Sequence, residues 1–232
     1  MNVERIFTKL YINGKVIGKN FEFKIVKQIN SLTEIAEIKI KKEYFEANDF
    51  SLKEKDKISI AMQINKETKV FDGIIIDFFN TKSAYDILTE SKNSFELSSV
   101  ASEKSFVNTK ASSIISQLTN FEIDSSLDVQ LERFIITKSA KREVLKTLLN
   151  TIEEVLKTDF YYYFDDKLKI KKELKGETYK IDDYTIKMNS SHITIFPLPG
   201  LSLADKLSYK GKEYSLKTII MQNKNFLLEV FK

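Results

Sequence analysis

Histidine, the side chain best suited to acid–base and metal chemistry at neutral pH, occurs once in this sequence, at His192. Ser190 and Ser191 precede it, but a serine nucleophile needs a base and a carboxylate in a defined geometry, which adjacency in the chain does not supply. Cysteine is absent, so disulfides, thiolate catalysis and zinc sites built from His and Cys are excluded. The alternation around His192 therefore indicates a partly exposed strand residue, not a catalytic one.

Carboxylates occur as adjacent pairs whose surroundings indicate turns or solvated faces. None of the pairs has the alternating acidic positions, central glycine and distant glutamate of a calcium loop. Two facing carboxylates also suffice for a glycosidase, and spacing in the sequence cannot locate such a pair. A carboxylate-based cell-wall hydrolase therefore stays open as an alternative. The pairs are Glu153-Glu154, Asp165-Asp166 and Asp182-Asp183.

Phosphate and nucleic-acid sites have little support in the sequence. The stretch from Gly14 to Gly18 lacks the terminal Gly-Lys-Ser/Thr of a phosphate loop, and Asn13-Gly14 is a strong hairpin-turn signal. No basic cluster interleaves the aromatic run 160–164, as base stacking requires. The net charge is only +4, from 37 basic and 33 acidic residues, which indicates no strong preference for nucleic acid. Four basic residues at the start of a predicted helix indicate a solvated face: Lys138, Lys141, Arg142 and Lys146.

The composition is that of a folded chain with one large domain or two small ones. Its 232 residues are 42% hydrophobic and 30% charged, which is enough apolar matter for a packed core. No apolar run approaches the roughly 20 residues that span a bilayer. The first ten residues carry Glu4 and Arg5 and lack the apolar core of a signal peptide. These features predict folding in a reducing cytoplasm without a membrane partner.

Most of the chain alternates polar and apolar residues with the period of two that is typical of half-buried strands. Residues 1–100 predict five or more strands, including residues 21–25, 36–40, 70–79 and 95–100. Gly73 is expected to mark a bulge within the third of these. Residues 178–232 predict an antiparallel meander that ends at the C-terminus.

Between these strand regions, residues 101–177 predict two helices and a hairpin. Asn108 or Thr109 is expected to cap a short helix that runs to Asn120, and Ser139 to cap a longer helix that runs to about Lys157. The aromatic run 160–164 and the alternating residues that follow it predict the hairpin. Helical spacing predicts one core-facing stripe on the longer helix: Val144, Leu145, Leu148, Leu149, Ile152, Val155 and Leu156.

The order of these elements resembles the baseplate hub family of phage and prophage tails, the late-control or tail-hub proteins. Relatives of that family occur in contractile injection systems and as the N-terminal part of type VI secretion spike proteins. Residues 71–75 read Phe-Asp-Gly-Ile-Ile, like the family's strand "F-x-G-x-I" that closes a first barrel, and Pro199-Gly200-Leu201 resembles the segment before its last strand pair. The chain departs from the family by having Ala204 where Gly often precedes Asp205, and by being shorter than many hubs.

The resemblance implies an α+β fold with two small antiparallel β-barrel modules, similar to those of tail tubes, and a helix-plus-hairpin insert between them. It assigns residues 1–100 to the first barrel, 101–177 to the insert and 178–232 to the strands that complete the second barrel. If residues 196–201 support a junction between the barrels, a β-branched residue at Gly200 should impair folding or ring formation. The candidates for structural roles in assembly are Gly73, Phe196, Pro197, Pro199, Gly200, Leu201, Asp205 and Gly211.

The resemblance also implies a non-enzymatic function without a cofactor or a small-molecule substrate. Hubs of this type resemble homotrimers whose two barrels per subunit form a pseudo-sixfold ring between the tail tube protein and the spike protein. Such a ring needs heterologous interfaces that close on themselves. The tape-measure protein or DNA would contact its lumen transiently, and the location would be the virion tail, after assembly in the host cytoplasm. The alternatives are a tube, distal-tail or adaptor subunit, the cell-wall hydrolase, and a nucleic-acid-binding module built on the tyrosine hairpin.

Overall fold

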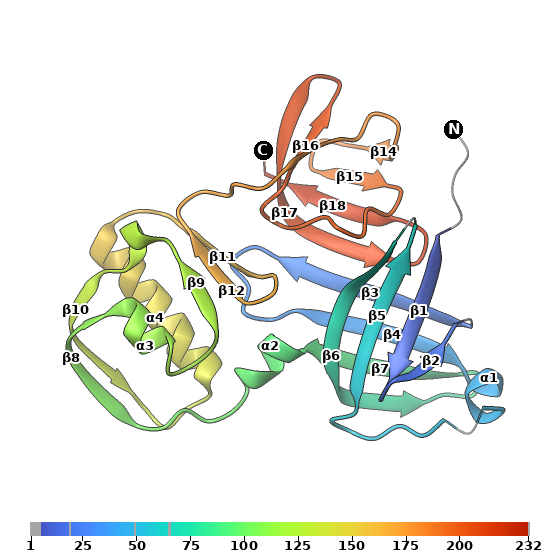
Figure 1. Cartoon of the computed structure of the whole chain (residues 1–232), viewed down its shortest axis with the longest axis horizontal. Helices are drawn as coiled ribbons and strands as arrows, with labels where there is room; N and C mark the ends of the chain where they lie inside the picture. Colours follow the sequence, from blue (N-terminus) through green and yellow to red (C-terminus); the bar gives the residue numbers. More distant parts are fainter. Residues whose placement is uncertain (1–5, 19, 49, 65, 232) are drawn as a thin grey trace. The chain divides into compact units, whose positions relative to one another are not determined.

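The computed structural model describes residues 6–18, 20–48, 50–64 and 66–231, and the chain divides into two compact units. Unit 1 comprises Met1–Gln28, Glu34–Lys92 and Gly176–Lys232, and unit 2 comprises Ile29–Thr33 and Asn93–Lys175. Unit 1 is built from strands of both ends of the chain, and unit 2 combines helices with two small sheets (Figure 1). The resemblance assigned residues 1–100 to a first barrel, 101–177 to an insert and 178–232 to a second barrel, and this assignment stays a prediction.

Unit 1 contains one large sheet in which nearly all pairs are antiparallel. The strand order is β14-β15-β18-β17-β3-β4-β7-β6-β5-β1-β2, while β16 pairs with β17, and β13 pairs in parallel with β16. A short helix, α1 (Lys42–Glu46), follows β4. The strands are β1 (Phe7–Ile12), β2 (Lys15–Ile17), β3 (Phe21–Gln28), β4 (Ile35–Lys41), β5 (Lys57–Gln63), β6 (Glu67–Asn80), β7 (Ala84–Ser91), β13 (Thr178–Lys180), β14 (Thr185–Met188), β15 (His192–Ile195), β16 (Lys206–Tyr209), β17 (Lys212–Gln222) and β18 (Phe226–Val230).

The core of unit 1 is formed by apolar residues that alternate with polar ones at a period of two, as the sequence predicts. Phe23 of β3 lies opposite Ile38 of β4, and both side chains are buried, whereas the neighbouring Glu22 and Glu37 are exposed. Burial of each large apolar side chain contributes about 1.5–3 kcal/mol. A slip of one residue would turn this whole apolar set toward water, so the buried face fixes the register.

Two long strands each change partners along their length. The first half of β6 pairs with β5 and its second half with β7. The start of β17 pairs with β16, and the rest pairs with β18 and β3. Figure 1 shows the consequence at the N-terminal end, where β1, β5 and β6 run across β3, β4 and β7. Strands that pass from one layer to another in this way form the corners of β-sandwiches and barrels.

The fold class is mostly β, because strands take 50% of the residues and helices 15%. Among the described strands, the order runs from β14 to β2 without a pairing that joins these two. The hydrogen bonds of this part of the chain therefore form one open, mostly antiparallel sheet, where the resemblance implied two antiparallel β-barrel modules. The antiparallel pairing of β17 with β3, in which Ile220 lies opposite Val26, joins the strands of the two ends of the chain into this one sheet.

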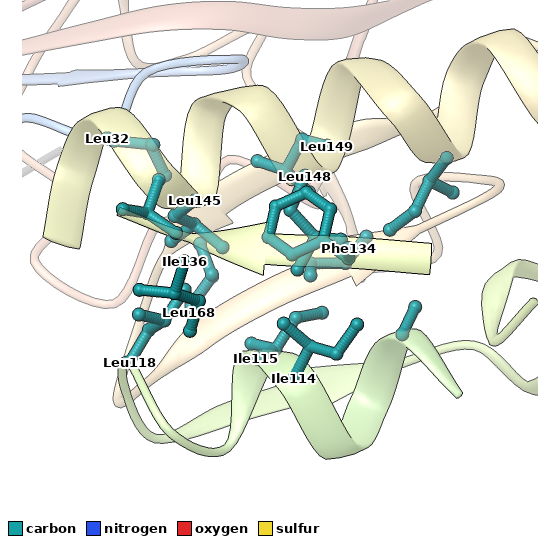
Figure 2. Packing of buried hydrophobic residues seen from close by; sticks show 14 of the residues in the cluster. Leu32, Ile114, Ile115, Leu118, Phe134, Ile136, Leu145, Leu148, Leu149 and Leu168 are labelled. Atoms are coloured by element: carbon teal, nitrogen blue, oxygen red, sulfur yellow. The ribbon is translucent and has the colours of Figure 1, made fainter. Parts of the chain in front are cut away.

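Unit 2 packs its helices against its strands around one apolar cluster. Leu145, Leu148 and Leu149 of α4 lie close to Phe134 of β10 and Ile114 of α3 (Figure 2). The predicted stripe on α4 is confirmed except at Val155, which is 54% exposed; Leu156 is half-buried and packs against the cluster. The elements are α2 (Lys92–Glu96, which begins at the last residue of unit 1), β8 (Lys104–Lys110), α3 (Ala111–Ile115), β9 (Phe121–Ile123), the 3-10 helix η1 (Ser125–Leu127), β10 (Gln130–Ile136), α4 (Lys141–Leu156), β11 (Tyr161–Phe164) and β12 (Leu168–Lys171). Strand β10 pairs with β8, and β12 pairs with β11 and β9.

The helix starts in unit 2 differ from those expected. Strand β8 continues through Lys110, so Asn108 and Thr109 lie in a strand and cannot cap α3. The Oδ1 atom of Asp128 instead accepts a hydrogen bond from the backbone N–H of Ser112 at 2.8 Å, which satisfies one of the free donors of the helix start. The N-cap of α4 is Ala140, without a side-chain cap, in place of the expected Ser139.

Residues 95–100 do not form the expected strand. Phe95 lies in α2, and the backbone N–H of Leu97 donates to the carbonyl of Ser94, so a helical turn replaces the strand. The predicted hairpin of aromatic residues is confirmed, because β11 pairs with β12.

Candidate functional site

The segment from Phe196 to Leu201 forms the connection between β15 and β16 in unit 1. The backbone N–H of Phe196 donates to the carbonyl of Tyr184, and that of Leu201 donates to the carbonyl of Leu198 in a tight turn. Pro197 and Leu201 are buried, Pro199 is half-buried, and Phe196 is 37% exposed. The buried side chains of Pro197 and Leu201 therefore hold the segment in unit 1, while Phe196 is partly exposed to water.

Asp205 ties this connection to a distant part of the chain. Its side chain is buried, with Oδ1 accepting from the N–H of Glu177 at 2.9 Å and Oδ2 accepting from the N–H of Ser202 at 2.7 Å. A Cβ atom on Gly176 would collide with Oδ1 of Asp205 and with the backbone of Ala204. Gly176 thus lets two backbone segments approach, and the carboxylate then holds β13 in parallel register with β16.

Gly176 was not among the residues that the sequence singles out, and it falls inside the expected insert. The sequence carries no signal for its role, because the partner atoms belong to residues 204 and 205, far along the chain. In the sequence, only the resemblance indicates a role for Asp205. The pair is best described as a clasp, the Gly176–Asp205 clasp, with a structural function.

Replacing Asp205 with alanine should lower the free energy of unfolding by about 1–3 kcal/mol, because two buried N–H donors lose their charged acceptor. Asparagine should restore part of the loss, since its carbonyl can still accept one bond. Urea unfolding measures both effects. Asp183→Ala removes an exposed carboxylate of the same region and should change stability by less than about 0.5 kcal/mol. Equal effects of Asp205→Ala and Asp183→Ala would contradict the clasp.

Gly73 is required for close packing and does not mark a bulge. It lies in β6 between Ile58 of β5 and Ser91 of β7. A Cβ atom there would lie 2.5 Å from the carbonyl oxygen of Glu90 and 2.5 Å from the ring of Phe71. The irregularities of β6 fall on either side of Gly73, one facing β5 and the other facing β7, so the expected bulge at this residue is wrong.

The other candidate glycines differ in what they require. Gly211 has φ +77° and follows Lys210 at φ +49°, which is the left-handed pair of a two-residue hairpin turn, here between β16 and β17. Asn13 and Gly14 form the same kind of turn between β1 and β2, as predicted. A Cβ atom on Gly200 would meet nothing within 4 Å, so the expected effect on folding of a β-branched residue there has no steric basis. A role of Gly200 in ring formation stays a prediction.

His192 does not form a catalytic triad. Its Nδ1 atom lies 2.9 Å from Oγ of the adjacent Ser191, and it faces Glu229 across the β15–β18 pair. The carboxylate of Glu229 instead accepts from Lys217 at 2.8 Å and Thr218 at 3.0 Å. The hydrogen bond from Lys217 lowers the pKa of Glu229, so this carboxylate is engaged in the sheet and does not orient an imidazole.

The densest charge cluster lies on the small sheet of unit 2. Glu122 of β9 is within 3.2 Å of Lys167, 3.0 Å of Lys169 and 2.5 Å of Lys171. These hydrogen bonds, that from Lys171 first, lower the pKa of Glu122 to about 2. The cluster links the parallel strands β9 and β12, and every carboxylate in it is already paired with lysine. Within the described residues, no group of three or more His, Asp or Glu side chains is placed to hold a metal ion.

Unfolding of unit 2 should depend on acid through Glu122. Its pKa is lower when folded than the ordinary value of 4.5, so its stabilising contribution is complete above pH 4.5 and is lost as pH falls from 4.5 toward 2. Melting temperatures measured from pH 6 to pH 2 should fall for the native protein and fall less for Glu122→Gln. Parallel curves for the two proteins would contradict this assignment. Asp166, whose pKa is also lowered by Lys169, adds a smaller dependence in the same direction.

Comparison with known proteins places the fold. No protein-family description and no curated protein matches the chain by sequence. The structure resembles the prophage MuSo2 43 kDa tail protein from Shewanella oneidensis, with TM-score 0.71, 10% identity, and 98% of this chain and 97% of that chain covered. It also resembles the tail protein from Neisseria meningitidis MC58, with TM-score 0.70, 8% identity and coverage of 98% and 96%.

A third similar structure is the E. coli c3393 protein, described as a type VI secretion component with structural similarity to the T4 tail proteins gp27 and gp5. Its TM-score is 0.60 at 9% identity, and 98% of this chain and 77% of that chain are covered. The resemblance expected from the sequence is therefore confirmed at the level of the fold. Over nearly its whole length, the chain has the fold of phage tail and type VI secretion proteins. No described helix is long and apolar enough to cross a membrane.

Proposed function

We propose that this protein is a structural, non-enzymatic component of a phage or phage-like tail, and that it is the baseplate hub. Three copies would form a ring that connects the tail tube protein to the central spike protein. The tape-measure protein or DNA would pass through its lumen. The ring would belong to the virion tail, after assembly in the host cytoplasm.

The observation that carries this proposal is the pairing of β17 with β3. Five residue pairs, from Thr218 opposite Gln28 to Gln222 opposite Lys24, join strands from the two ends of the chain. Each end also has its own partner-changing strand, β6 or β17, so one subunit presents two similarly built halves on a continuous sheet. Two such halves in each of three subunits give six positions, which suits a junction between sixfold and threefold structures.

The sheet also offers what a closed ring requires, which is two different surfaces that meet. Among the described strands, β14 ends the sheet on one side and β2 on the other. Ile186 of β14 and Val16 of β2 are each 50% exposed. Edge strands with exposed apolar side chains favour pairing with another chain, and contacts between unlike surfaces form a ring when the rotation between neighbouring subunits closes.

A tube, distal-tail or adaptor subunit is the alternative. A single module per chain would suffice for a sixfold tube, whereas the sheet of this chain runs through both ends. The helical unit 2 is a further addition that a plain tube subunit does not need. A carboxylate-based hydrolase of the cell wall is disfavoured because the densest cluster holds its carboxylates in ion pairs.

Electron microscopy of the purified protein at high concentration, combined with light scattering, tests the proposal. We expect threefold rings with an open centre and the mass of three subunits. Sixfold rings of six subunits would favour the tube alternative, and monomers at every concentration would favour an adaptor. Release of soluble muropeptides from purified cell walls by the native protein would contradict a non-enzymatic function.

The ring should be sensitive to charge on the β14 edge. Ile186→Lys places a cation on an exposed side chain of the edge strand, so the subunit should stay folded and lose ring formation. The matched control is Val155→Lys, which changes a side chain of similar exposure, 54% against 50%, in unit 2. Sedimentation velocity of the two variants gives the comparison. Rings of native size with Ile186→Lys would exclude this edge from the interface.

A further inference from the structure

The pair of strands β8 and β10 in unit 2 is a ribbon with one buried face and one outward face. Phe106 lies opposite Phe134, and these side chains are 9% and 8% exposed, so they form the buried face. Val107 lies opposite Arg133 in the next pair and is 65% exposed, and Ile135 is 50% exposed. The outward face therefore presents two β-branched aliphatic side chains to water.

Arg133 lies between these two aliphatic side chains on the outward face. It is directly opposite Val107 and two residues before Ile135 along β10, so the three share one face of the ribbon. Arg133 is exposed, and no carboxylate within the described ranges forms an ion pair with it. By contrast, Lys110 at the end of the same ribbon lies 3.8 Å from Asp128.

The ribbon also has unused pairing capacity. Among the strands that the structure describes, only β8 and β10 form this sheet, so each strand has a free edge. An added strand gains main-chain hydrogen bonds as well as side-chain contacts.

We propose that this ribbon docks an extended segment of a partner protein in which a carboxylate is flanked by aliphatic residues. The partner's aliphatic side chains cover Val107 and Ile135, and its carboxylate pairs with Arg133. The charge of Arg133 selects the partner, because a carboxylate left among aliphatic side chains without a cation is costly. Arginine is among the residue types enriched at the centres of interfaces.

Nucleic acid fits this surface less well than a protein segment does. The exposed aliphatic side chains offer no base-stacking surface, which aromatic residues would provide. Duplex DNA is nevertheless a defined outcome of the test.

The test uses the 232-residue chain with isotope-labelled methyl groups and the synthetic peptide Ser-Val-Thr-Glu-Thr-Val-Ser. Alternation puts its two valines and its glutamate on one face. At millimolar concentration, the peptide should shift the methyl signals of Val107 and Ile135 while those of the buried Leu148 stay unchanged. Arg133→Glu should weaken binding about tenfold, which corresponds to about 1.4 kcal/mol, and should make the same peptide with Lys in place of Glu the better ligand.

Three results would overturn the proposal. The first is the absence of shifts at Val107 and Ile135, and the second is binding that Arg133→Glu leaves unchanged. The third is occupation of the face by something else. A duplex DNA oligonucleotide that shifts the same methyl signals at lower concentration would assign it to nucleic acid, and shifts that depend on protein concentration alone would assign it to a second copy. The Leu148 methyl signals report that each variant is folded.

Discussion

Gly73→Val should prevent unit 1 from reaching its native packing, with a loss in the free energy of unfolding of about 3 kcal/mol or more. The Cβ atom alone would lie 2.5 Å from a backbone oxygen of β7 and 2.5 Å from the Phe71 ring. The oxygen belongs to the hydrogen-bonded ladder between β6 and β7, so it cannot move aside as a flexible side chain could. Overpacking of this kind typically costs about 1–3 kcal/mol, and more where backbone must shift.

Urea unfolding of native protein, Gly73→Ala and Gly73→Val measures the effect, with circular dichroism at low urea as a check on folding. Gly200→Val is the matched control, because its Cβ atom meets nothing within 4 Å and its backbone is outside the left-handed region. We expect the control to unfold like the native protein. A stable Gly73→Val protein would show that β6 can separate from β7, and close packing would then no longer explain the glycine.

Local signals in the sequence predicted the parts of the fold that depend on local physics. The alternation of β3 and β4 follows from one buried face, and the turns at Gly14 and Gly211 follow from their positive φ angles. The stripe on α4 was predicted because helical spacing brings residues 144–152 onto one side. In each case the deciding interactions lie within a few residues of chain.

Long-range pairings decided the features that could not be predicted from the sequence. The joining of both ends of the chain into one sheet depends on the pairing of Val26 with Ile220, and the sequence of neither strand identifies its partner. The Gly176–Asp205 clasp joins segments about thirty residues apart, and it requires a residue without a Cβ atom at position 176. The alternation of polar and apolar residues does not reveal such a requirement. Asp128 similarly supplies, from 16 residues along the chain, the cap of α3 that the sequence predicted at Asn108 or Thr109. Candidate residues taken from the resemblance were therefore located individually, but they do not form one site.

Leu148→Ala should destabilise unit 2 by about 2–5 kcal/mol, the range for truncation of a fully buried leucine. Leu148 is 0% exposed and lies in the cluster formed by α4, α3 and β10 (Figure 2). The loss combines the transfer free energy of the removed carbons with the cavity they leave. Val155→Ala is the matched control on the same helix, because Val155 is 54% exposed, and it should change stability by less than about 0.5 kcal/mol.

Hydrogen exchange measured residue by residue shows in which unit Leu148→Ala lowers the stability. If the units open separately, Leu148→Ala should accelerate exchange in β10 and α4 while the amides of β3 and β17 keep their native protection. Equal acceleration in both units would mean that they unfold together, so that the core of unit 2 also stabilises the sheet of unit 1. Equal stability of Leu148→Ala and Val155→Ala would instead contradict the buried position of Leu148. The first pattern would make unit 2 an independently stable insertion, which could carry a partner-docking ribbon without perturbing the sheet proposed to build the ring.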